Sequence, residues 1–132
     1  MSDLRDLNAA SAAVIELAKT FMTFLNANVP GWRAGYFRAY VTVGENGANA
    51  STFNGESVEL VSAVGNTQFF KEARTHAVQV FHDIGVNPGV LLLTCRSDFS
   101  YDIKFERDDL SRWEITKLDG KTGVPEGESL PQ

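Results

Sequence analysis

The residues best suited to chemistry gather between positions 99 and 114, where acidic and aromatic side chains follow one another closely. Residues 99–106 alternate strictly, with large apolar side chains at the odd positions and polar or charged ones at the even positions. A period of two is typical of a strand with one buried face and one wet face. A charged, mostly acidic turn follows. We interpret the stretch as a surface that recognises a partner rather than one that makes or breaks bonds. Its candidate residues are Asp102, Glu106, Asp108, Asp109, Trp113 and Glu114.

The acidic members would give this surface its charge, and Trp113 would give it an aromatic anchor that loses its water on docking. A second interpretation of Trp113 remains open, in which its ring caps the edge of the sheet, because Trp is highly buried on average. Asp108 and Asp109 also resemble a catalytic carboxylate pair. Adjacent residues rarely converge on one substrate atom, so a solvated acidic turn is favoured.

Other residues that could support catalysis or bind metal are poorly placed for it. His76 and His82 lie six residues apart on one predicted helix, whereas helical metal pairs need a spacing of three or four. Cys95 falls within an apolar run and is expected to be a buried small hydrophobe. The sequence has no glycine-rich phosphate loop and no nucleophile elbow. We therefore expect no enzyme, no cofactor and no metal.

Composition restricts the class of partner and the compartment. The 132 residues carry a formal net charge of −5 with a pI near 4.9, which disfavours nucleic acid and suits a basic protein partner. A single cysteine excludes an internal disulfide. The N-terminal residues resemble neither a signal peptide nor a transit peptide, and no run reaches the ~20 apolar residues of a membrane span. We therefore expect a cytoplasmic protein that does not contact membranes.

The elements that must position the acidic surface follow from periodicity. Two stretches with helical spacing of apolar residues flank three short alternating stretches, and two further strands close the chain. Consecutive strands with short turns predict an antiparallel sheet, which two amphipathic helices cover on one face: a two-layer α+β fold of about five strands. We expect one domain over residues 1–117 and an extended or partly disordered tail over 118–132. The order of the strands stays open. The expected helices are 3–28 and 68–84, and the expected strands are 36–43, 50–53, 57–63, 90–96 and 99–106.

Three segments carry a resemblance to a known family: VPGWRAGYFRAYVTV, FFKEARTHAVQVFHDIG and SYDIKFERDDL. With the long N-terminal helix before them, they resemble the layout of the YezG-like immunity and antitoxin family over roughly residues 17–113. Trp32 matches the family's early tryptophan. The matching positions of its acidic and aromatic final strand are Phe99, Tyr101, Asp102, Phe105, Glu106 and Asp109.

The resemblance implies a bacterial immunity protein that binds one cognate secreted toxin, often a nuclease, and neutralises it in the producing cell. Complementary charge would bring an acidic inhibitor to a basic toxin. Alternatives remain open: a small-molecule or peptide binding module on an open sheet face bearing Tyr36, Arg38 and Tyr40, an effector adaptor or chaperone, or an enzyme with an unrecognised site. The oligomeric state is not predicted.

Overall fold

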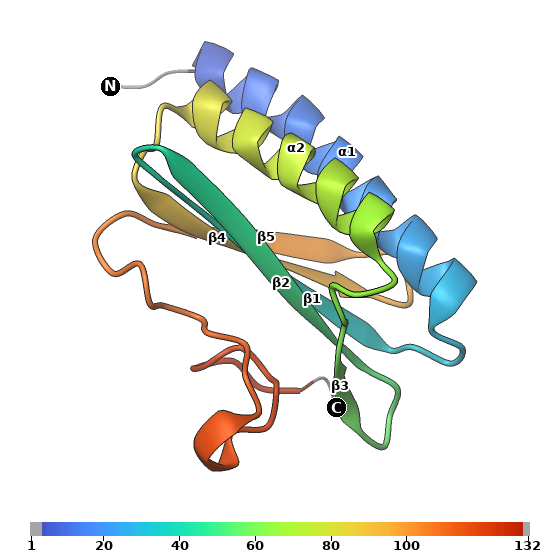
Figure 1. Cartoon of the computed structure of the whole chain (residues 1–132). Helices are drawn as coiled ribbons and strands as arrows, with labels where there is room; N and C mark the ends of the chain where they lie inside the picture. The colour runs from blue at the N-terminus through green and yellow to red at the C-terminus, as the bar shows by residue number, and fades with distance from the viewer. Residues whose placement is uncertain (1–3, 131–132) are drawn as a thin grey trace.

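Two helices and a five-stranded antiparallel sheet form an α+β fold, as the sequence predicts (Figure 1). The computed structural model describes residues 4–130, and side chains from residue 12 onward. The elements, in chain order, are α1 (Leu4–Asn28), β1 (Ala34–Thr42), β2 (Glu45–Phe53), β3 (Val58–Leu60), α2 (Thr67–Ile84), β4 (Gly89–Arg96), β5 (Tyr101–Glu106) and the short 3-10 helix η1 (Leu118–Gly120).

The strands lie in the order β3-β2-β1-β4-β5, with every neighbouring pair antiparallel. This order places β1 at the centre and leaves β3 and β5 as the two edges. β2 is much longer than its expected range, because it pairs with β1 along its whole length after a two-residue turn at Val43 and Gly44. β5 begins two residues later than expected, because Phe99 adopts a positive φ of 69° and belongs to the turn.

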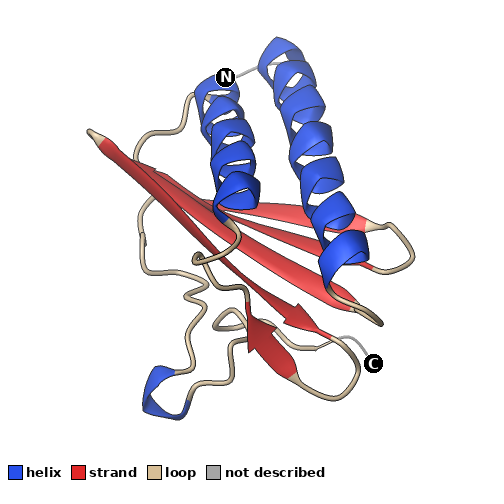
Figure 2. Cartoon of the chain, turned by 45° about the vertical axis from the view of Figure 1, so that its right-hand side comes forward, coloured by secondary structure: helices blue, strands red, loops and turns tan. Residues whose placement is uncertain are grey.

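Both helices cover the same face of the sheet, here named the helix side (Figure 2). From residue 12 onward the predicted apolar stripes pack there, with Leu17, Phe21 and Leu25 of α1 fully enclosed, while the side chains of Leu4 and Leu7 lie outside the described ones. Close approach of α1 to β1 requires a glycine, because a Cβ at Gly35 would lie 2.6 Å from Leu25 Cδ1. α2 ends at Gly85, whose left-handed φ of 71° closes the helix as predicted.

The opposite face of the sheet, here named the tail side, is not open as expected. Residues 107–130, here named the C-terminal segment, cross it and bury a second core (Figure 1). Tyr36, Val90 and Leu92 contribute to this core from the sheet, and Trp113 and Ile115 from the segment. Residues 118–130 contain η1, a bend at residues 123 and 124 and a turn at residues 126 and 127. The expectation of an extended or partly disordered tail did not include their packing on the sheet.

The predicted burial of one face of β5 is wrong in part. Phe99 is 62% exposed, Tyr101 37% and Phe105 39%, and only Ile103 packs against the core. The reason is position: α1 packs over β1 and β4 and leaves much of the edge strand β5 uncovered. Alternation identifies the two faces of a strand but does not show whether a second layer reaches them.

Candidate partner-binding surface

The turn after β5 is a loop of residues 107–114, here named the acidic loop, whose residues are exposed apart from the half-buried Leu110 and the buried Trp113. Glu106, the last residue of β5, holds its first half. One oxygen of its carboxylate, Oε2, accepts the backbone N–H groups of Asp108 at 3.0 Å and Asp109 at 3.2 Å. The other, Oε1, accepts Nη1 of Arg112 at 2.7 Å. The Arg112 guanidinium and the two N–H donors lower the pKa of the Glu106 carboxyl below its ordinary value.

Arg38, at the centre of β1, holds the second half of the loop. Its Nη2 donates to the carbonyl of Leu110 at 2.6 Å, and its Nε donates to the carbonyl of Arg112 at 2.8 Å. The guanidinium is half-buried, and this burial lowers its pKa, which the nearby carboxylate of Glu114 opposes. Two carbonyls of the loop are therefore fixed to the middle of the sheet.

Trp113 anchors the end of the loop in the tail-side core. Its side chain is 3% exposed, and its backbone takes a positive φ of 62°. The guanidinium of Arg112 lies 5.0 Å from the centre of its ring. A conformation so unusual for a bulky residue is sustained by the surrounding contacts. The ring is turned into the protein, as a cap over the sheet requires, and offers almost no surface to a partner.

The acidic loop presents its remaining carboxylates to solvent. Asp109 accepts the N–H and O–H of Ser111 through one oxygen, whereas the carboxylates of Asp108 and Glu114 have no bonded partner within residues 12–130. Within residues 107–114, Asp108, Asp109 and Glu114 give three negative charges against two positive ones from Arg107 and Arg112, an excess of one negative charge. Glu106, at the base of the loop, adds another carboxylate, but it is paired with Arg112.

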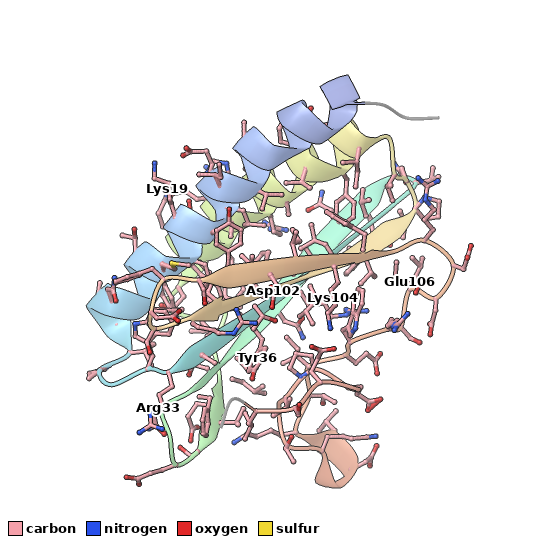
Figure 3. All side chains as sticks on the ribbon, turned by 180° about the vertical axis from the view of Figure 1, so that it is seen from behind. Lys19, Arg33, Tyr36, Asp102, Lys104 and Glu106 are labelled. Atoms are coloured by element: carbon pink, nitrogen blue, oxygen red, sulfur yellow. The ribbon has the colours of Figure 1, made fainter. Side chains whose placement is uncertain are left out.

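Asp102 is not part of this loop. It lies near the other end of β5 and forms an ion pair with Arg96. Lys104, next on the same face, pairs with Glu128 of the C-terminal segment at 2.9 Å. Figure 3 shows Asp102 and Lys104 on β5 above Tyr36, on the tail side of the sheet. The predicted set therefore divides: Asp108, Asp109 and Glu114 form the surface, Glu106 and Trp113 position it, and Asp102 lies elsewhere.

A polar cavity of about 330 Å³ lies beside Asp102, between β1, β4, β5 and the end of the C-terminal segment. Its lining includes Arg96, Lys104 and Glu128. Tyr36 also lines it with a side chain only 1% exposed, and among the described residues the buried hydroxyl of Tyr36 has no hydrogen-bond partner. Burial raises the pKa of that hydroxyl, and Glu128 raises it further.

The sequence did not reveal the residues that hold the C-terminal segment in place. Asn49 and Ser51 of β2 donate their side chains to the carbonyls of Ile115 at 3.0 Å and Gly123 at 2.7 Å, and Arg38 acts in the same way on the acidic loop. One signal was available, since Arg38 and Asn49 are polar residues on facing positions of central strands. Polar side chains in the middle of a sheet need partners, which implies a covering segment rich in carbonyls.

Cys95 is buried as expected, and this burial raises the pKa of its thiol to about 12. Among the described residues, no three side chains of His, Cys, Asp or Glu gather as a metal ion would require. Neither helix within residues 4–130 combines the length and apolar composition needed to cross a bilayer.

Comparison with known proteins leaves the family open. No protein-family model matches the chain, and no curated protein matches it either. The resemblance to the YezG-like family therefore stays a prediction, and the geometry of the acidic loop is the basis on which a function is proposed.

Proposed function

We propose that this chain is a non-enzymatic immunity protein that acts in the bacterial cytoplasm and neutralises a basic toxin by docking the acidic loop onto it. One observation carries this proposal. The loop is exposed and carries an excess of negative charge, yet Glu106, Arg38 and Trp113 hold it in one conformation from beneath. A loop that is ordered before it binds loses little conformational entropy on docking.

Charge supports the choice of a basic partner. Proteins that act on nucleic acid present Lys and Arg to the phosphates, and such a surface attracts carboxylates. Among the described side chains, the Asp108 carboxylate makes no hydrogen bond or ion pair and is exposed to the cations of a partner, whereas Glu114 lies near Arg38 and Lys121 of its own chain.

The test is rescue of growth when the chain is expressed with the product of a neighbouring toxin gene. Reversing two charges, Asp108→Lys with Asp109→Lys, should abolish protection because the loop then repels a basic surface. The matched control is Glu56→Lys with Glu59→Lys, which makes the same change of charge at exposed positions beside the opposite edge of the sheet.

Each variant is first compared with the wild type by thermal unfolding, so that a loss of fold is not mistaken for a loss of docking. Protection by the folded loop variant at the wild-type level would contradict the acidic loop as docking element. A partner that binds without any rescue of growth would instead indicate an adaptor or chaperone.

The Tyr36 hydroxyl favours a second candidate function, the binding of a small polar molecule. A buried hydroxyl without a partner is rare and costs free energy, and a ligand acceptor in the cavity would satisfy it. The Arg96–Asp102 and Lys104–Glu128 pairs would offer both signs of charge to such a ligand. The site lies under the C-terminal segment and not on an open sheet face.

A melting-temperature screen across small carboxylates, amino acids and nucleotides tests this candidate, since binding to the native state alone raises stability. A compound that raises the melting temperature of the wild type, and does so less for Tyr36→Phe, would support it. No shift with any compound of the panel would count against it.

A further inference from the structure

The outer edge of β5 is free to pair with another strand. β5 is the last strand of the sheet, and within residues 4–130 no other backbone segment pairs with its outer side. Its helix-side aromatic residues, Tyr101 and Phe105, are more than one-third exposed. An edge strand of this kind is a template for the strand of another chain.

The hydrogen-bond pattern shows which residues point outward. The N–H of Arg96 donates to the carbonyl of Ser100 at 2.9 Å, so this opposed pair belongs to the hydrogen-bonded class of the β4–β5 ladder. The two classes alternate along antiparallel strands. The even residues of β5 therefore bond to β4, and its odd residues direct their N–H and C=O groups away from the sheet. These outward residues are Tyr101, Ile103 and Phe105.

The sequence of β5 is complementary to itself when read in reverse. Tyr101 and Phe105 are aromatic, Asp102 and Lys104 have opposite charge, and Ile103 lies at the centre. An antiparallel copy centred on Ile103 would place Tyr101 opposite Phe105 of the second copy, and Asp102 opposite Lys104 of the second copy. Both kinds of cross-strand pair stabilise a sheet.

Shifting the two-fold axis by one residue in either direction removes this charge complementarity. A two-fold axis at Asp102 would oppose two aspartates, and one at Lys104 would oppose two lysines while bringing Asp102 against Glu106 of the other copy. Like charges directly opposite each other are destabilising. With the axis at Ile103, the outward-pointing N–H and C=O groups of Tyr101, Ile103 and Phe105 face the same groups of the second copy. This arrangement allows about six backbone hydrogen bonds, two at each of three opposed residue pairs.

We infer that the chain forms a symmetric dimer in which two β5 strands pair antiparallel about Ile103 and join the two sheets into one. The inference is independent of the proposed toxin, because it rests on the free edge of β5 and on the charge order Asp102–Lys104 alone. The dimer is closed, since both β5 edges are used and the other edge, β3, has only three residues. The pairing covers the exposed rings of Tyr101 and Phe105.

Sedimentation and light scattering over a series of chain concentrations test the inference. The contact is small, so a monomer–dimer equilibrium with a micromolar dissociation constant is expected. Asp102→Lys and Lys104→Asp each oppose like charges at both symmetric pairs, and each should weaken dimerisation at least about tenfold. Mixing the two variants pairs Lys with Asp at every position again, so the mixture should form a heterodimer near wild-type affinity.

Each single change also removes an ion pair within its own chain, so circular dichroism is used to check that both variants fold. A second pair of variants avoids these charges altogether. Phe105→Pro removes an outward N–H without touching the β4–β5 ladder and should abolish the dimer. Phe105→Thr keeps that N–H and should dimerise more weakly than the wild type but better than Phe105→Pro.

A wild-type chain that stays monomeric up to about 1 mM overturns the inference, because a micromolar dissociation constant would make the chain mostly dimeric at that concentration. A dimer that is indifferent to both single charge changes and to Phe105→Pro overturns it equally, because its interface would then lie elsewhere.

Discussion

Replacing Trp113 by alanine should destabilise the protein strongly and release the C-terminal segment from the sheet. The side chain is 3% exposed and packs among Tyr36, Leu92 and Ile115 in the tail-side core. Deleting a buried Trp side chain costs about 3 to 5 kcal/mol, which combines the lost burial with the cavity left behind. For 132 residues at about 2.1 cal/mol/K of unfolding entropy per residue, this corresponds to a melting temperature lower by roughly 10 to 20 °C.

Urea unfolding followed by circular dichroism measures the change in free energy, and thermal unfolding measures the change in melting temperature. The matched control is Leu118→Ala, in the same segment but 75% exposed, which should stay within about 0.5 kcal/mol of the wild type. Hydrogen exchange on Trp113→Ala should speed up first in residues 107–130.

A Trp113→Ala variant within about 1 kcal/mol of the wild type would refute the reasoning, because a segment that merely rests on the sheet contributes no core. The acidic loop would then lose its anchor, and with it the argument that it is ordered before binding.

Three further predictions concern individual side chains: the Tyr36 hydroxyl, the Glu106 carboxyl and the Cys95 thiol. Tyr36→Phe should leave the free energy of unfolding unchanged or raise it by up to about 1 kcal/mol, since it removes a buried hydroxyl without a partner; urea unfolding measures this. Glu106 has its pKa held below the ordinary 4.5 by Arg112, so its stabilisation is complete above that value and is lost as pH falls through the lower folded-state pKa. The protection factor of the Asp108 amide, which is its exchange rate in the unfolded chain divided by its rate in the folded one, should therefore fall in acid for the wild type and change much less for Glu106→Gln. Cys95 should not react with a thiol reagent at pH 8 until the protein unfolds, because its thiol is buried with a pKa of about 12.

The fold could be predicted from the sequence where periodicity carries the information. The buried stripe of α2 and the alternation on β1 mark helix and strand unambiguously, and the short turns make the sheet antiparallel. The strand order could not be predicted, because β1 pairs with both β2 and β4 and no local pattern specifies a partner distant in sequence.

The C-terminal segment escaped prediction for a related reason. Its apolar residues, such as Leu110, Ile115 and Val124, are isolated by glycine, proline and charge and follow no period. Each fits a site on the sheet that exists only after the strands have assembled. The tail side therefore looked open, and the segment that covers it looked extended or disordered.

The candidate surface was predicted in composition but not in structure. The acidic residues after β5 are a plain feature of the sequence, whereas the bond from Glu106 back to Arg112 spans a loop whose path the sequence does not specify. Trp113 illustrates the same limit, since an aromatic residue beside acids suits both an exposed anchor and a buried cap. Burial by the tail-side core decides between them.

Capture of a partner by the tagged protein from host lysate, at low and at high salt, tests the central claim about the acidic loop most directly. The account predicts one basic protein that is retained at low salt by the wild type and by Glu56→Lys/Glu59→Lys, weakened at high salt, and lost with Asp108→Lys/Asp109→Lys. Equal capture of that protein by the folded loop variant would contradict the account.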